Sequence, residues 1–224
     1  LLFTLLLSIE KENLIEFWTA FILTLFVKED SAIYLVSIGL FELLRKDRRG
    51  WQGGALIIGS VIYFAVISNF VLDTNAFEYR YENLIADGSK SFYAELIKIF
   101  FTQPLYLLSE ILTEEKITFL LVTFLPLAFI PLTGLVSLPD AALFLPLLAI
   151  NLIPNWEAQY SIQYQYSFGS APLYLLLMVR FFARPIAPRW KKTCSTLAVF
   201  ATLIVSVSFF SGQIQHFCDY LDKN

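Results

Sequence analysis

Charged residues are scarce in this sequence, and the residues of common soluble-enzyme sites are nearly absent. Asp, Glu, Lys and Arg make up 16% of the 224 residues, whereas a soluble domain carries about 25%. The one histidine, His216, has no Cys or His at ligand spacing around it, so we expect no metal site there. The sequence shows no Ser/His/Asp arrangement, phosphate-binding loop or CxxC pair. These absences give no support to a soluble enzyme.

The sequence has no excess of positive charge. The net charge is −3 and the pI is about 5.2, and no basic run carries interleaved aromatic residues, so we exclude nucleic acid as a partner.

The sequence has two cysteines. Cys194 and Cys218 stand at opposite ends of the apolar run 195–211. If this run spans a membrane, the two thiols face different compartments and are too far apart for a disulfide.

Apolar residues dominate what is present, at 57% of the chain with a mean hydropathy of +0.65. They form blocks bounded by charges or prolines. The clearest block, 54–72, makes roughly 28 Å of helix, close to the hydrocarbon thickness of a bilayer. The sequence therefore predicts an all-α, polytopic transmembrane helical bundle, a single membrane domain over 1–224 in a multi-pass protein, and we expect a prokaryotic plasma membrane. The expected spans lie near 1–8, 14–27, 31–44, 54–72, 117–132, 141–153, 171–182 and 195–210.

Two strongly basic connections set the expected orientation. Lys and Arg concentrate in cytoplasmic loops of membrane proteins, so we place both connections inside. Four expected spans lie between them, an even number, which agrees with this placement. The segments 73–116 and 154–169 are then external. The basic residues are Arg45, Lys46, Arg48 and Arg49 in the first connection, and Arg184, Arg189, Lys191 and Lys192 in the second.

The external segment 73–116 has a mixed-charge part and an apolar part. We expect most of its charges to be solvated. The apolar part, 91–112, has sparse polar residues and is interrupted at Pro104, which is typical of an interfacial helical segment lying on the outer leaflet. One additional span is the alternative for this part. The charged residues of the first part are Asp73, Glu78, Arg80, Glu82 and Asp87.

Lys28, Glu29 and Asp30 stand together between two apolar runs. Either 14–27 and 31–44 form a helical hairpin with the triplet at its external tip, or 14–44 is one helix with the triplet inside the membrane. We favour the hairpin, because each charge at the bilayer centre costs about 2.5–3.5 kcal/mol. Lys28 is then suited to hold an anionic group while a carboxylate contacts a polar substrate or a metal. The structural alternative is an interfacial turn with a snorkelling lysine.

The external segment 154–169 concentrates amides and phenols. Such groups suit sugars, because amides pair with hydroxyls and aromatic rings stack on the C–H faces. An aromatic belt at the membrane interface is the equally weighted alternative. The candidate substrate-binding residues of this segment are Asn155, Gln159, Gln163, Tyr164 and Tyr166.

The order and spacing of several motifs resemble one family of membrane proteins. "FILTLFVKEDSAIYLVSIGLFELLRKDRR" is followed by "YRYENLIADG", "LPLLAINLIPN" and "QYSIQYQYSFGSAPLYLL". This succession, over roughly 14–180, is similar to the DUF2079 family of predicted polytopic membrane proteins. The KED after an apolar helix and the "SIQYQYS" before another are its most specific parts.

The resemblance implies a function, because that family is grouped with the GT-C membrane glycosyltransferases. These have many helices, an external active site and a polyprenyl-phosphate-linked sugar donor. The resemblance implies membrane lipid and such a donor as partners, with Lys28 facing the donor phosphate. We assign no cofactor, and leave a divalent metal open.

The start of the chain bears on the catalytic residues. The chain begins "LLFTLLLS" inside an apolar run and its only methionine is Met178, so we expect the C-terminal part of a longer protein. In GT-C enzymes the base is an acidic residue of the first external loop, which such a part lacks, and we assign no catalytic residue. The alternative function is a non-enzymatic transporter or scaffold subunit, because discontinuous helices with intramembrane charges also occur in transporters.

Overall fold

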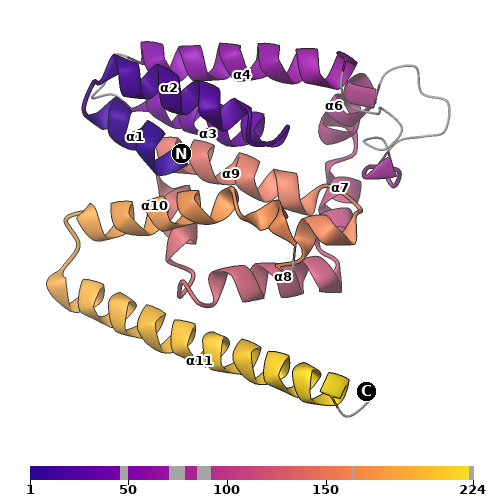
Figure 1. Ribbon diagram of the computed structural model, residues 1–224, viewed down its shortest axis with the longest axis vertical. Helices are drawn as coiled ribbons and strands as arrows, with labels where there is room; N and C mark the ends of the chain where they lie inside the picture. The colour runs from indigo at the N-terminus through magenta and orange to yellow at the C-terminus, as the bar shows by residue number, and fades with distance from the viewer. Residues whose placement is uncertain (46–49, 71–78, 85–91, 163, 222–224) are drawn as a thin grey trace.

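The computed structural model describes residues 1–45, 50–70, 79–84, 92–162 and 164–221, and all regular elements in these ranges are helical (Figure 1). This confirms the predicted all-α fold for the described residues. The α-helices are α1 (Leu2–Glu10), α2 (Leu14–Leu25), α3 (Ser31–Leu44), α4 (Trp51–Phe70), α6 (Phe92–Thr102), α7 (Pro104–Ile111), α8 (Glu114–Phe124), α9 (Leu138–Leu152), α10 (Ser170–Ala183) and α11 (Pro188–Leu221). Short 3₁₀ helices are η1 (Ile130–Val136), η2 (Glu157–Tyr160) and η3 (Gln165–Ser167).

Several helices begin at residues whose side chains cap them. The Asn13 side chain accepts hydrogen bonds from the N–H groups of Ile15 and Glu16 at the start of α2. Thr113 caps α8 and Ser137 caps α9 in the same way. These residues satisfy N–H groups that have no partner within the helix. The helix boundaries therefore follow from local sequence.

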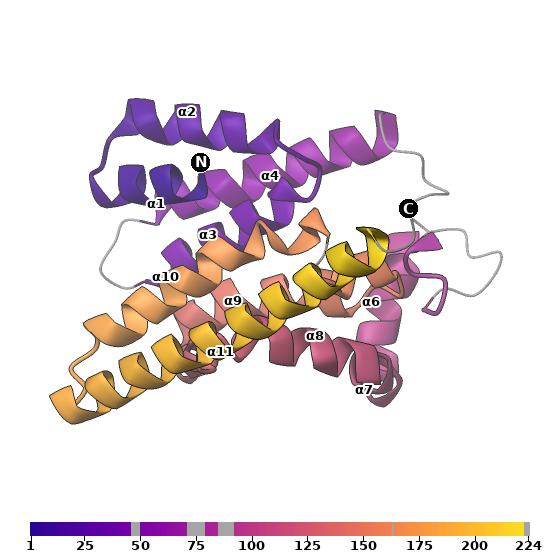
Figure 2. The same cartoon turned by 60° about the horizontal axis from the view of Figure 1, so that its bottom comes forward.

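Helix α3 lies at the centre of the fold and packs most extensively against α4 and α9 (Figures 1 and 2). Leu35 and Ile38 of α3 and Leu147 of α9 are fully buried in the main core. Gly39 and Gly53 allow α3 and α4 to approach closely, because a Cβ atom on Gly53 would lie 2.6 Å from the Gly39 carbonyl oxygen. Small residues at helix contacts are common in membrane proteins, where backbones pack closely.

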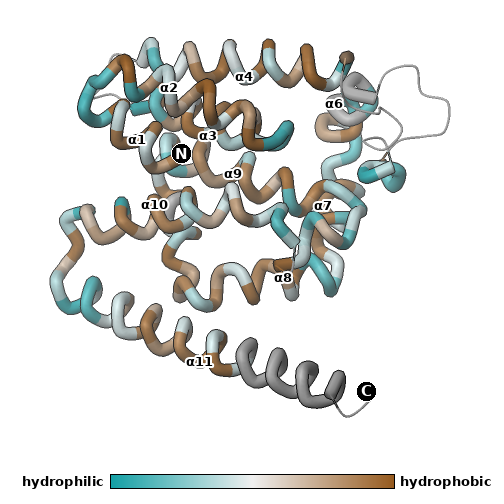
Figure 3. The backbone as a smooth tube through the Cα atoms, viewed as in Figure 1, coloured by the Kyte–Doolittle hydropathy of each residue, from teal (hydrophilic) through white to brown (hydrophobic). Residues whose placement is uncertain are grey.

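Apolar side chains cover much of the outer surface. Within the described residues one helix, α4, is long and apolar enough to cross a membrane, and only 17% of its span is buried in the protein. Val61, Ile62 and Val66 of α4 are more than 45% exposed, and hydrophobic positions run along most of the helix (Figure 3). Exposed apolar surface of this extent indicates an interaction site, such as a membrane. Shorter apolar helices are α2, α3, α9 and α10.

The structure agrees with the expected break at the KED triplet and departs from one expected span. The chain breaks between α2 and α3, as expected, so 14–44 is not one helix, although α3 packs mainly on α4 and α9 and has few contacts with α2. In the expected span 117–132, α8 ends at Phe124 and the chain turns through Ala128 and Phe129, which have left-handed φ values of 48° and 55°. Pro126 contributes to this end, because proline supplies no backbone N–H.

Other expectations are met or cannot be placed. The segment 91–112 is interrupted at Pro104, which begins α7 after the end of α6. Several residues singled out from the sequence lie outside the described residues: Lys46, Arg48, Arg49, Asp73, Glu78, Asp87, Gln163, and the side chains of His216 and Cys218.

Candidate functional site

A cavity of about 570 Å³ lies where the turn between α2 and α3 meets η3 and the start of α10. This volume is within the range of pockets that bind small ligands, about 300–1,000 Å³. Its wall combines residues from both motifs that the sequence singled out. The lining residues are Leu1, Leu2, Phe3, Thr24, Val27, Lys28, Asp30, Ser31, Tyr34, Gln165, Tyr166, Phe168, Gly169 and Pro172.

Two of the three KED residues form the charged part of this wall. The Lys28 ammonium lies 2.7 Å from Asp30 Oδ2 and 3.7 Å from the centre of the Tyr166 ring. Asp30 is buried, whereas Lys28 is partly exposed. Glu29 does not line the cavity and instead lies near Tyr63 of α4. The ammonium is thus held between a carboxylate and an aromatic face, an arrangement that charge-assisted and cation–π attraction both favour.

Tyr34 joins the two motifs behind this pair. Its hydroxyl donates a 3.3 Å hydrogen bond to the carbonyl oxygen of Tyr166. Its ring packs directly on Gly169, where an added Cβ would lie only 2.1 Å from the Tyr34 ring. Glycine at 169 is therefore required for Tyr34 to occupy this position, and Tyr34 in turn positions η3 beside Lys28.

An aromatic pair with a second cation lies beside the cavity. The rings of Trp156 and Tyr166 meet edge to face at 4.9 Å. The Arg80 guanidinium lies 4.5 Å from the Trp156 ring and 5.9 Å from the Tyr166 ring. The Asn155 N–H donates a 2.7 Å hydrogen bond to the Arg80 carbonyl oxygen. We expected Arg80 to be solvated, but its guanidinium contacts these two rings, and no local sequence pattern indicates a contact with residues this distant in the chain.

The candidate residues of 154–169 do not all gather at the cavity. Among them, Tyr166 lines it, whereas the Asn155 and Tyr164 side chains are exposed and Gln159 is buried away from it. Gln163 lies outside the described residues. Gln165, another amide of the same segment, also lines the cavity, whereas sequence reasoning did not identify Tyr34 and Gly169 as wall residues. A role in substrate binding stays a prediction for every one of these residues.

A buried lysine of α8 joins the end of α7 to η2. The Lys116 ammonium donates a 2.8 Å hydrogen bond to the Glu110 carbonyl oxygen and lies 5.3 Å from the Tyr160 ring. Burial lowers the pKa of Lys116, and the Glu110 and Glu115 carboxylates oppose this shift. Burial, with Glu115 and Glu157 nearby, raises the pKa of Tyr160. Tyr160 therefore remains a neutral phenol, and the contact anchors the segment that carries Trp156.

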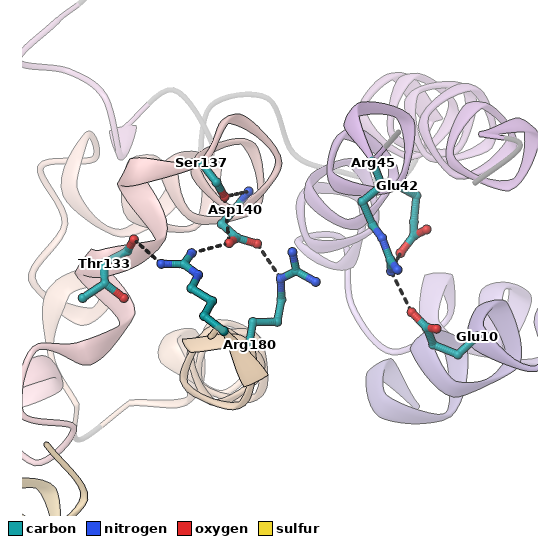
Figure 4. Close-up of polar contacts among 8 residues, drawn as sticks. Glu10, Glu42, Arg45, Thr133, Ser137, Asp140 and Arg180 are labelled. Atoms are coloured by element: carbon teal, nitrogen blue, oxygen red, sulfur yellow. Dashed lines mark hydrogen bonds and ion pairs between the residues drawn. The ribbon is translucent and has the colours of Figure 1, made fainter. Parts of the chain in front are cut away.

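A second polar cluster lies at the opposite end of α3 (Figure 4). Asp140 accepts hydrogen bonds from Arg180 at 2.5 Å and from Arg184 at 2.7 Å. Arg45 pairs with Glu10 and Glu42. The Phe41 ring joins the two groups, because the guanidinium carbons of Arg45 and Arg180 lie 5.4 and 4.6 Å from its centre. The ends of both basic connections therefore lie on the same side of the protein.

The polar groups of the cavity limit the chemistry it can perform. Asp30 is the one carboxylate on the described wall, and within the described ranges no group of three His, Cys, Asp or Glu is placed to hold a metal. Lys28 is the one cation on that wall. The described wall is thus suited to hold a polar or anionic head group.

Comparison with known proteins places the chain in a family. No curated protein and no solved structure matches it. A family described as a predicted membrane protein matches residues 1–217, nearly the whole sequence. The match includes both motifs that meet at the cavity, the KED turn and the "SIQYQYS" segment. The chain therefore belongs to the DUF2079 family of predicted membrane proteins.

Proposed function

We propose that this chain is part of a multi-pass membrane glycosyltransferase of the GT-C type, which transfers a sugar from a polyprenyl-phosphate donor on the external face. The observation that supports this proposal is the cavity beside Lys28. The cavity wall combines the Lys28–Asp30 pair with apolar side chains, and a lipid-linked phosphate likewise combines a polar head with an apolar chain.

The apolar part of the wall comes from three separate segments. Leu2 and Phe3 belong to α1, Val27 follows α2, and Phe168 and Pro172 flank the start of α10. These side chains suit the first isoprene units of a lipid, which prefer apolar surroundings. The donor's phosphate would then lie at Lys28 and its sugar beside Gln165 and Tyr166.

Lys28 would act on the leaving group. A lysine ammonium has three N–H donors; Asp30 accepts one and the Tyr166 ring faces the ammonium, so a donor remains for a phosphate oxygen. A fixed cation beside the phosphate stabilises the negative charge that develops as the glycosidic bond breaks. Asp30 keeps the ammonium in place. Because Asp30 lies on the leaving-group side, the base that activates the acceptor must come from outside the described wall.

The orientation of the chain supports an external site. Arg45 and Arg184 lie at the end of the protein expected to face the cytoplasm, and Lys28 lies at the other end of α3. The 14 residues of α3 correspond to about 21 Å of helix. The cavity would therefore open towards the outer part of the bilayer, where lipid-linked sugars of GT-C enzymes are used.

Binding and transfer in proteoliposomes test this proposal. The protein containing this chain is reconstituted with a radiolabelled polyprenyl-phosphate hexose, and retention of label is compared with that of polyprenol lacking phosphate. We expect retention of the phosphate-bearing lipid and its loss in Lys28→Gln, whereas Lys192→Gln, at an exposed position of α11, behaves as wild type. Equal retention of both lipids contradicts the proposal. Solute uptake without sugar transfer supports the transporter alternative.

A further inference from the structure

We propose that a buried polar cluster behind the cavity holds a bound water molecule. The cluster, which we call the polar junction, consists of Tyr34 of α3, Asn151 of α9, and Ser170 and Tyr174 of α10. All four residues are at most 7% exposed. The junction lies where three helices meet, and neither the family nor the proposed function assigns it a ligand.

Two oxygen atoms of the junction lack hydrogen-bond partners among the described residues: Asn151 Oδ1 and the Tyr174 hydroxyl. The Asn151 amide nitrogen donates to the Leu147 carbonyl oxygen at 3.1 Å and to Ser170 Oγ at 3.4 Å. The Tyr174 hydroxyl interacts with the side chains of Ser170 and Asn151, but neither contact has the distance and angle of a full hydrogen bond. The polar groups are therefore close to one another and incompletely bonded.

Bulk solvent is kept away from these atoms. The Tyr174 ring packs against Phe124 at 4.9 Å and Phe144 at 5.6 Å, and both phenylalanines are at most 1% exposed. Leaving a buried donor or acceptor unpaired costs about 1–3 kcal/mol. A single water that contacts two to four polar atoms removes this cost, and such waters are regular components of protein interiors.

The charge of the junction favours water over a cation. Its oxygen atoms belong to two phenols, one hydroxyl and one amide, all neutral. Asp30, the carboxylate that interacts with Tyr34, already pairs with Lys28 at 2.7 Å. A cation in the junction would therefore be a buried charge without a counter-charge, which is strongly unfavourable. The bound water would link α9 and α10 and support Tyr34 in the cavity wall.

Radiolytic labelling in purified protein tests this proposal, because hydroxyl radicals formed from a bound water oxidise the side chains around it. Relative to the intrinsic radical reactivity of each side chain, we expect Tyr174 to be oxidised severalfold faster than Phe144, which is at least as buried and adjoins the same cluster. Asn151→Leu should remove this excess. Oxidation of Tyr174 no faster than that of Phe144 overturns the proposal.

Thermal stability provides a second test, which does not need the Asn151 variant and so remains possible if that variant folds poorly. If the water is bound, Tyr174→Phe removes one of the water's hydrogen-bond partners and should lower Tm by about 2–4 °C. Tyr63→Phe on α4, whose ring is only partly buried, is the matched control and should leave Tm unchanged. An unchanged or raised Tm for Tyr174→Phe means that the hydroxyl is unpaired and overturns the proposal. Stabilisation by Na⁺ over choline also overturns it, in favour of a cation.

Discussion

The Lys28 ammonium lies 3.7 Å from the centre of the Tyr166 ring, although the two residues belong to motifs that are far apart in the sequence. Lys28 is in the turn before α3, and Tyr166 is in η3 before α10. A cation over an aromatic face contributes about 0.5–1 kcal/mol at exposed sites and about 2 kcal/mol where water is excluded, and the partly exposed Lys28 lies between these limits. This contact, with the hydrogen bond from Tyr34 to the Tyr166 carbonyl oxygen, brings the KED turn and the "SIQYQYS" segment to one cavity.

Replacing Lys28 tests its proposed role with the donor. Lys28→Gln should reduce sugar transfer by orders of magnitude, because a charge contact with an anionic leaving group acts chiefly on the transition state. Lys28→Arg should restore activity only in part, since a planar fork replaces a compact ammonium. Membrane fractionation checks that the variants insert. Full activity of Lys28→Gln with a lower yield of folded protein would identify the triplet as a structural turn.

Two tyrosines of the same segment should differ in their effect on stability. Tyr166 contacts Lys28 and Trp156, whereas the Tyr164 side chain is 49% exposed. Tyr166→Leu should lower the unfolding free energy by about 1–3 kcal/mol through lost cation–π and aromatic contacts. Tyr164→Leu should change it by less than about 0.5 kcal/mol. Thermal unfolding in detergent measures both, and equal effects would show that the Tyr166 contacts are not stabilising.

Gly169 should tolerate no side chain. An alanine Cβ at this position meets the Tyr34 ring at 2.1 Å, so Gly169→Ala should destabilise the protein by about 1–3 kcal/mol and displace the cavity wall. Gly54 of α4 is the matched control, because a Cβ there meets nothing within 4 Å. Gly54→Ala should be neutral or stabilise by up to about 1 kcal/mol. A neutral Gly169→Ala would mean that Tyr34 does not occupy this position.

The buried ion pairs at the opposite end of α3 should contribute more to the unfolding free energy than an exposed ion pair does. Asp140 is 1% exposed and pairs with Arg180 and Arg184; Asp140→Asn should cost about 3 kcal/mol, because it leaves partly buried arginines without a counter-charge. The exposed pair of Glu95 and Lys98 is the control, and Glu95→Gln should cost less than about 1 kcal/mol. Chemical unfolding compares the two; a smaller loss for Asp140→Asn would contradict the burial argument.

Cysteine labelling tests the orientation. In a background with Cys194→Ser and Cys218→Ser, a membrane-impermeant thiol reagent should reach a cysteine at Asn155 from outside but not one at Arg189. Both positions are exposed, so accessibility in the folded protein is not limiting; Gln159 is unsuitable because it is 2% exposed. External labelling at position 189 would reverse the expected topology.

Much of the helical framework could be predicted from the sequence. The expected helix at 31–44 is the observed α3, and the expected interruption at Pro104 separates α6 from α7. These features depend on local chemistry: apolar runs bounded by charges, and a proline that supplies no backbone N–H. Residues 117–132 show the limit of such reasoning, because hydropathy does not distinguish a straight helix from α8 followed by a turn at Ala128 and Phe129.

Composition and hydropathy specify a helical, apolar chain and identify the two motifs that carry its unusual polar residues. Which of those residues meet depends on tertiary packing. Lys28 and Asp30 line the cavity while Glu29 does not, and Tyr166 lines it while Tyr164 does not. The segment 154–169 is irregular, so no periodicity fixes the direction of its side chains. Their directions follow instead from long-range packing, above all the fit of Tyr34 on Gly169.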